Sequence, residues 1–198
     1  MLVSGGLDSA MLAAEYLAKG WEVTPFFVRS GLCWEKAEFF WLQRLLRTLK
    51  HPRLKKLVVA EAPMDGIFGR HWSVSGKGTP AWGSPWERDY LPGRNLVLLA
   101  HAGIFSGLNG IPLLALGILK GNPFSDATPV FIRSMQKTIN LAMGTRVKIA
   151  FPYARLTKAE ILRRVPGFPV RLTFSCLKPA GRAHCGKCEK CGERAGVI

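Results

Sequence analysis

Segments typical of β-strands alternate with segments typical of α-helices along most of this 198-residue chain. The helix-like segments carry apolar side chains at intervals of three and four residues, and the strand-like segments are short apolar runs. Strands and helices that take turns predict right-handed crossovers and a parallel sheet with helices on both faces. The expected fold class is therefore α/β, with a doubly wound, mainly parallel sheet.

The expected elements are bounded by these patterns and by residues that stop helices, such as Gly20. We expect strands at residues 1–3, 21–28, 56–60, 112–119 and 147–151, and helices at residues 8–19, 35–49, 94–108, 129–143 and 157–165. Thr157 and Glu160 have the spacing of a capping box, which marks the start of the last helix. Residues 63–93 are rich in Gly, Pro and Trp and lack periodicity, so we expect a long functional or mobile loop there.

A pair of glycines stands between the first expected strand and the first expected helix, in the string Ser-Gly-Gly-Leu-Asp-Ser at residues 4–9. The glycines let the backbone turn tightly and present its N–H groups to an anion, and the helix behind them adds the positive end of its dipole. Ser4 and Ser9 can donate hydrogen bonds to phosphate oxygens. Asp8 would repel a bare phosphate, so we expect Mg²⁺ beside it. A simple turn with a capping side chain is the alternative, and the full string favours a phosphate site.

Four of the five cysteines form a cluster with the spacing C-x8-C-x2-C-x2-C: Cys176, Cys185, Cys188 and Cys191. Because no export signal precedes them, metal binding is favoured over disulfides. Four thiolates suit tetrahedral Zn²⁺ with no open position, which predicts a structural site. A [4Fe–4S] cluster and four unmetallated cysteines are the alternatives. We expect one domain, with residues 1–175 as its nucleotide-binding part and residues 176–198 as a zinc-binding appendage.

The composition limits the partners of the chain. Lys and Arg number 28 against 13 acidic residues, a net charge of +15 that attracts polyanions. The basic residues are spread along the chain, so a nucleic-acid partner stays open but is not expected. The sequence has no uncharged apolar run of the roughly 18 residues that crossing a bilayer needs, and no signal-peptide pattern. We therefore expect a cytoplasmic protein without a membrane partner.

The string at residues 4–9 resembles the signature of the PP-loop ATP pyrophosphatases, Ser-Gly-Gly-x-Asp-Ser. Together with the cysteine cluster, it resembles the 7-cyano-7-deazaguanine synthase family within that class. Four further strings are similar to segments of that family: Leu-Pro-Gly-Arg-Asn at residues 91–95, Phe-Ser-Asp at 124–126, Thr-Lys-Ala-Glu at 157–160 and Thr-Phe-Ser-Cys at 173–176. The resemblance thus covers nearly the whole chain.

This resemblance implies a fold, a reaction and a set of cofactors. The fold would be Rossmann-like, of the adenine nucleotide alpha hydrolase type. ATP would adenylate the carboxylate of 7-carboxy-7-deazaguanine, ammonia would displace AMP to give an amide, and a second ATP would convert the amide into the nitrile. The product is a precursor of queuosine and archaeosine in tRNA. ATP, Mg²⁺ and Zn²⁺ are the implied cofactors, the carboxylate and ammonia the partners, and a homodimer stays open.

The resemblance also implies roles for particular residues. It places ATP against the loop and its flanks, at Val3, Ser4, Gly5, Gly6, Leu7, Asp8, Ser9 and Ala10. It implies catalytic roles for Asp8, Lys158 and Arg94, and substrate-binding roles for Arg94, Asn95 and Asp126. Other roles stay open, since Arg94 can be a surface charge, Lys158 a solvated side chain and Asn95 a helix cap.

The chain departs from the family pattern in three places. Only residues 1–3 precede the loop, so either the true start lies upstream or the first strand is short. Residues 29–34 replace a segment of the Gln-Arg-His type. After Asp126 the family usually has Cys-Arg and then Glu, whereas Ala127, Thr128 and Val130 stand here. Charges that recognise the substrate can therefore be missing.

These departures leave other functions open. One is a paralogous PP-loop ligase or tRNA-modifying enzyme that acts on a different carboxylate or carbonyl. A tRNA-thiolating enzyme would use a catalytic cysteine or an iron–sulfur cluster, and Cys33 is the single cysteine outside the cluster. A non-enzymatic zinc module that binds RNA is another candidate. Trp72, Trp82 and Trp86 could stack on a purine or pack as part of a core or lid.

Overall fold

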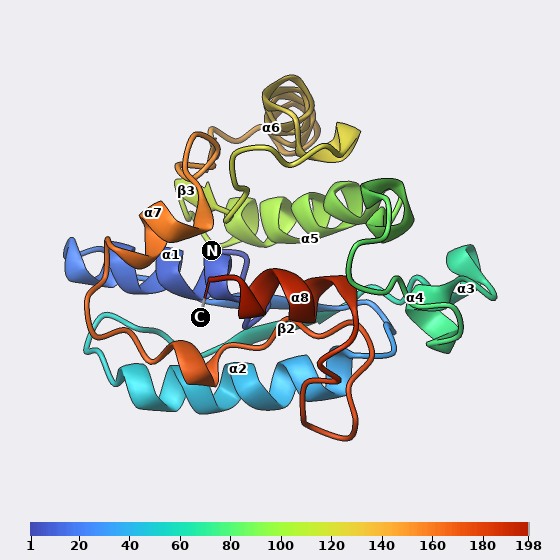
Figure 1. Cartoon of the computed structure of the whole chain (residues 1–198). Coiled ribbons are helices and arrows are strands. Elements are labelled where there is room, and N and C mark those ends of the chain that lie inside the picture. Colours follow the sequence, from blue (N-terminus) through green and yellow to red (C-terminus); the bar gives the residue numbers. More distant parts are fainter. Residues whose placement is uncertain (198) are drawn as a thin grey trace.

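A parallel β-sheet lies at the centre of the computed structural model, which describes residues 1–197, and helices cover both of its faces (Figure 1). Strand β1 (Phe26–Arg29) pairs with β2 (Val58–Glu61), and β3 (Leu113–Ala115) pairs with β4 (Lys148–Ala150), each pair in parallel. The expected α/β class with parallel strands is confirmed.

Residues 1–3 join the two strand pairs into one sheet. The backbone N–H of Leu2 donates to the carbonyl oxygen of Ala115 at 3.0 Å, and the N–H of Phe26 donates to the carbonyl of Met1 at 2.8 Å. The lateral order is therefore β2, β1, residues 1–3, β3 and β4. The chain leaves the centre of the sheet directly into residues 4–9, at the point where the two halves of a parallel sheet diverge and ligands commonly bind.

The long helices begin and end close to the residues that their apolar periodicity predicts. They are α1 (Leu7–Ala18), α2 (Glu35–Leu49), α5 (Arg94–Leu108) and α6 (Pro129–Met143). The helix predicted at residues 157–165 is shorter, since α7 is Lys158–Leu162, and α8 (Glu189–Ala195) follows in the cysteine-rich segment. The capping box of Thr157 and Glu160 is present at the start of α7. The remaining helical turns are short: α3 (Asp65–Phe68), α4 (Trp72–Ser75), η1 (Trp86–Asp89), η2 (Ser125–Ala127) and η3 (Val170–Leu172).

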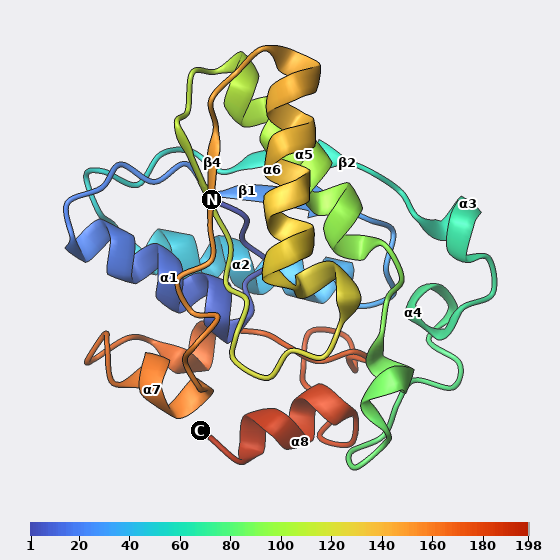
Figure 2. The same ribbon diagram turned by 90° about the horizontal axis from the view of Figure 1, so that it is seen from above.

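Alternate residues of the central strands point to opposite faces of the sheet, as the pleat requires. Leu2 and Phe26 belong to the apolar core beneath α5 and α6, which lie side by side (Figure 2). Val3 and Phe27 pack against Leu42 of α2 on the other face. Figure 1 shows α5 and α6 on one side of the sheet and α2 on the other. This arrangement holds the loop at residues 4–9 rigidly between two cores.

The strands are shorter than the apolar runs predict. The run at residues 21–28 forms a strand only from Phe26, because Pro25 has no N–H to donate to a ladder. The run at residues 112–119 leaves the strand after Ala115, although the N–H of Leu116 still bonds to the carbonyl of Ala150 at 3.0 Å. Among residues 1–197, no helix has both the length and the apolar character needed to cross a membrane.

Candidate active site and metal centre

The loop at residues 4–9 turns in a way that only glycine permits at its second position. Gly5 has a φ of +81°, and a Cβ added there would lie 3.1 Å from the Cβ of Leu42 and 3.3 Å from the carbonyl oxygen of Glu38. The carbonyl of Gly5 accepts a hydrogen bond of 2.8 Å from the N–H of Phe174, the segment that leads into the cysteine cluster. The loop is thus fixed from both sides.

The two serines of the loop hold its own backbone. The hydroxyl of Ser9 accepts from the N–H of Ser4 at 3.2 Å and donates to the carbonyl of Gly6 at 3.3 Å, while the hydroxyl of Ser4 accepts from the N–H of Gly6 at 3.1 Å. Gly6 is the N-cap of α1 and provides no side-chain cap. The first-turn N–H groups of α1 therefore lack a side-chain acceptor and offer an anion site.

Asp8 presents a carboxylate oxygen that lacks a partner. Its Oδ1 is buried and receives no hydrogen bond from the described residues. Burial raises the pKa of Asp8 to about 6, although the charges of Lys158 and Lys190 oppose the shift. A buried carboxylate at a phosphate-binding loop fits a ligand of Mg²⁺, which prefers oxygen ligands and would neutralise the charge.

A cleft of about 610 Å³ opens in front of this loop. Its walls come from the segments that follow the parallel strands, from the first turns of α2, α5 and α7, and from α8. Figure 2 shows α7 and α8 at the same edge of the molecule. The cleft contains the predicted site residues Ser4, Gly6, Leu7, Asp8, Arg94, Asn95, Asp126 and Lys158. Most of the residues assigned by resemblance therefore face one space.

Three basic side chains in this cleft, those of Lys158, Lys190 and Arg94, are paired or partly buried. Lys158 is only 16% exposed, and its Nζ lies 2.5 Å from Oε1 of Glu193 on α8. Lys190 of α8 lies 3.0 Å from the same carboxylate and 3.6 Å from Asp89. The Nε of Arg94 is buried and has no partner among the described residues. Both Lys158 and Arg94 are thus directed into the protein and not into open solvent.

Asn95 and Asp126 bind each other across the cleft wall. The carboxylate of Asp126 accepts from the backbone N–H of Asn95 at 3.0 Å and from its Nδ2 at 3.3 Å. Asp126 thereby caps the first turn of α5 from a distant segment, which the sequence could not reveal. A direct substrate role for either residue stays a prediction.

Glu38 is an acid in the cleft that the sequence analysis did not single out. It lies on α2, is only 8% exposed and lines the cleft beside Arg94. Burial raises the pKa of Glu38 to about 7, while the Arg94 charge acts in the opposite direction. Buried acids with displaced pKa values are candidates for functional groups.

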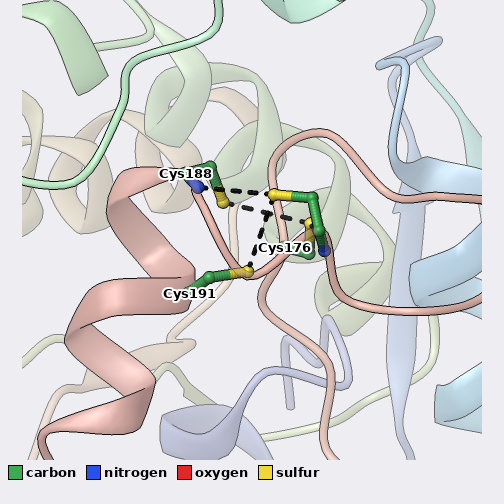
Figure 3. A group of neighbouring side chains, drawn as sticks. Cys176, Cys188 and Cys191 are labelled. Carbon is green, nitrogen blue, oxygen red and sulfur yellow. Dashed lines mark hydrogen bonds between the residues drawn. The ribbon is translucent and has the colours of Figure 1, made fainter.

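The four clustered cysteines have the geometry of a tetrahedral metal site. All four Sγ atoms lie within 4.8 Å of one another, and the pairs Cys185–Cys191 and Cys176–Cys188 are 3.9 Å apart (Figure 3). Tetrahedral zinc with Zn–S bonds of about 2.3 Å requires S–S separations of about 3.8 Å. The contact between the Cys176 and Cys188 thiols lowers the pKa of Cys188 and raises that of Cys176, so without a cation this pair favours one thiolate and not two.

Backbone N–H groups surround these sulfurs. The N–H of Leu177 points to Sγ of Cys188 at 3.4 Å, and the N–H of Cys185 points to Sγ of Cys176 at 3.3 Å. The N–H groups of Lys187 and Cys188 point to Sγ of Cys185 at 3.4 and 3.3 Å. Such donors offset the negative charge of metal-bound thiolates. The cluster therefore fits zinc.

The cysteine-rich segment also holds one wall of the cleft. Ala81 pairs with Cys188 as an antiparallel bridge, and the N–H of Trp82 donates to the carbonyl of Lys187 at 3.0 Å. The N–H of Gly83 donates to the Glu189 carboxylate at 2.8 Å. The Trp82 ring covers Gly192 so closely that an added Cβ would lie 2.0 Å from it. Residues 80–83, in the middle of the long loop, are thus attached to the metal centre.

Family comparison supplies the observation that decides where this site belongs. A family model described as queuosine biosynthesis protein QueC matches residues 1–197. The chain belongs to the QueC family. The matched range includes both the loop at residues 4–9 and the four cysteines.

Relatives of this QueC-family chain carry one name in several organisms. The 7-cyano-7-deazaguanine synthase 1 of Desulfitobacterium hafniense is 25% identical over 213 residues, which covers 100% of this chain and 90% of the relative. The 7-cyano-7-deazaguanine synthase of Acetivibrio thermocellus is 29% identical, covering 96% of this chain and 88% of the relative. The synthase of Campylobacter curvus is 27% identical, with 99% and 93% covered.

Two residues of this QueC-family site were missed by sequence reasoning. A Cβ on Gly117 would lie 3.0 Å from backbone atoms of Asp8 and Ser9, so only glycine lets this segment pass the loop. The signal was a glycine inside a strand-like run, which often marks a close backbone approach. Glu38 had no clear signal, because acidic residues are common in the first turns of helices, where they usually face solvent.

The structure explains two of the positions at which the chain departs from the QueC-family pattern. The hydroxyl of Thr128 accepts from the N–H of Phe131 at 3.2 Å and caps α6, and Val130 is 73% exposed. Among the described residues, the cleft walls include Asp126 but not Ala127, Thr128 or Val130.

Of the three tryptophans, Trp72 stacks on Trp34 at 5.7 Å, whereas Trp82 and Trp86 are 60% and 51% exposed at the cleft.

Proposed function

We propose that this chain is an ATP-dependent 7-cyano-7-deazaguanine synthase, which converts 7-carboxy-7-deazaguanine and ammonia into the nitrile. The observation that carries the proposal is the glycine turn at Gly5, which opens on a cleft beside the unpartnered Asp8, in a chain of the QueC family. The relatives named above carry the same activity in their names. The fold type that fits this assignment is the Rossmann-like adenine nucleotide alpha hydrolase fold.

The reaction consists of two adenylation steps. A carboxylate oxygen of the substrate attacks the α-phosphorus of ATP, and pyrophosphate leaves. The nitrogen of ammonia then attacks the acyl carbon, AMP leaves with the bonding electrons, and an amide remains after proton loss. The amide oxygen attacks the α-phosphorus of a second ATP, and a second pyrophosphate leaves. Loss of the nitrogen protons and of AMP produces the carbon–nitrogen triple bond.

The residues at the loop would stabilise the charge that these steps create. The N–H groups of Gly5 and of the first turn of α1 would bind the departing pyrophosphate. Asp8 would hold Mg²⁺, which supplies positive charge at the phosphates when bound. Lys158 and Arg94 approach from opposite walls, and Lys158 exchanges Glu193 for a phosphate oxygen. Val3 and Ala10 complete the proposed ATP contacts at the two ends of the loop.

The cysteine cluster has a separate role in this proposal. Its four sulfurs leave no open position for a substrate, so zinc would stabilise the fold and take no part in bond making. The two parts of the chain, residues 1–175 and 176–198, are proposed to act as one domain. The thiol of Cys33 donates to the carbonyl of Leu177 at 3.4 Å, and burial raises its pKa, which argues against a thiolating cysteine.

The assignment is tested by incubating the protein with MgATP, ammonium and 7-carboxy-7-deazaguanine. Mass spectrometry is expected to show the nitrile and two AMP for each nitrile formed. Release of AMP with another carboxylate, and none with the deazaguanine, would instead indicate a paralogous ligase. No AMP with any carboxylate, together with salt-sensitive RNA binding, would favour the RNA-binding module.

A further inference from the structure

One end of the cleft lies between the first turns of α2 and α5. Trp34 and Glu38 are four residues apart on the α2 side, so they share a face, and both line the cleft. Leu91 and Arg94 line it from the α5 side, where the N–H of Arg94 donates to the carbonyl of Leu91 at 3.1 Å. The Trp34 ring stacks on Trp72 with an interplanar angle of 24°, which fixes a flat apolar wall.

Glu38 is the acid at this end of the cleft, and burial there disfavours the charged form of its carboxylate. The neighbouring Glu35 already binds the backbone, since its Oε2 accepts hydrogen bonds from the N–H groups of Ser30 at 2.5 Å and Gly31 at 2.9 Å. Burial raises the pKa of Glu38, the Arg94 charge lowers it and the Glu35 charge raises it, and the side chain lines the cleft. Because Glu38 is 8% exposed and lines the cleft, a ligand with N–H donors that enters this end of the cleft can reach its carboxylate.

We propose that Glu38 recognises the guanine-type edge of the substrate, an inference that rests on the proposed function. The pyrimidinone ring of 7-carboxy-7-deazaguanine carries a ring N–H next to an amino group, and both point in one direction. A carboxylate accepts from two such parallel donors at once, and charge-assisted pairs of this kind are strong. Glu38 therefore replaces the recognition charges that residues 29–34 lack, and it sets the specificity for a 2-amino heterocycle.

The test compares two substrates with the wild type and the Glu38→Gln variant at saturating ATP and ammonium. The second substrate is 7-carboxy-7-deazahypoxanthine, which lacks only the 2-amino group. The wild type is expected to prefer the guanine compound by about 100-fold in kcat/KM, because a site built for a donor rejects an analogue without it. Glu38→Gln should reduce this preference to roughly 10-fold or less through a higher KM for the guanine compound, with the KM for ATP unchanged.

Two outcomes would overturn the inference separately from the proposed function. If the wild type makes the nitrile and Glu38→Gln keeps the full preference, Glu38 does not recognise the edge. If the variant instead changes the KM for ATP or ammonium, Glu38 serves another ligand. A wild type that makes no nitrile refutes both proposals.

The matched control is Glu61→Gln, whose side chain is 75% exposed at the end of β2 and away from the cleft. It should leave every kinetic constant unchanged. Should Glu38→Gln fold poorly, quenching of the wild-type tryptophan fluorescence by the two heterocycles gives the same comparison. Equal affinity for both compounds would again contradict the inference.

Discussion

Asp8 is the residue on which the nucleotide chemistry depends most. Its Oδ1 is buried without a partner at the start of α1, directly behind the glycine turn. Lys158, by contrast, has a structural partner in Glu193. The position of Asp8 is therefore better explained by an absent ligand than by the stability of the fold.

The Asp8→Asn variant should lower the rate of AMP formation by at least about 100-fold, because an amide cannot neutralise a bound cation. Its melting temperature without nucleotide should not fall, since the amide removes a buried charge. Rates of AMP release and thermal melts check both parts. AMP release at the wild-type rate would remove Asp8 from the proposed chemistry.

The ionisation of Glu38 in the cleft should affect the free energy of unfolding of the protein. Burial raises its pKa from 4.5 to about 7, so the folded state disfavours the charged form relative to the unfolded state. The free energy of unfolding should therefore fall as the pH rises from about 4.5 through about 7.

Glu38→Gln mimics the protonated acid and should raise the free energy of unfolding at pH 8 by at most roughly 3 kcal/mol. Near pH 4.5 the variant and the wild type should unfold alike. Urea titrations at both pH values give the comparison, and Glu61→Gln is the control. An equal gain at both pH values would mean that packing, and not the charge, causes the effect.

At the scale of elements, the cysteine-rich segment also positions one wall of the cleft. α8 carries Lys190 and Glu193 into the cleft, and the segment at residues 185–189 holds residues 80–83 by backbone hydrogen bonds. The metal centre is therefore expected to determine whether this wall of the cleft is ordered.

Removal of zinc by a chelator, or the Cys188→Ser substitution, should expose the backbone N–H groups of Trp82 and Gly83. Their hydrogen exchange should become at least about 10-fold faster, since local opening costs less free energy without the metal. Amides in α6 serve as the internal control and should change far less. Unchanged protection of Trp82 and Gly83 would show that the wall is ordered independently of the metal.

At the scale of the whole molecule, the features that were predicted from the sequence are those that depend on neighbouring residues in the chain. The bounds of α2, α5 and α6 follow from apolar periodicity, and the glycine turn and the cysteine spacing are contiguous in the sequence. Glu38, Gly117 and the pairing of Asp126 with Asn95 were not predicted, because the importance of each depends on segments that only the fold brings together. The extent of the strands was overestimated where Pro25 interrupts the ladder.

The bridge between Ala81 and Cys188 joins positions that are separated by more than half of the chain. Contacts between such distant positions form late, because a large entropy loss precedes the gain. Residues 80–83 can pair with the cysteine-rich segment only after that segment has folded, and we propose that the segment folds around its metal ion. We therefore expect the supply of metal during synthesis to set the moment at which a newly made molecule first becomes able to hold its substrate.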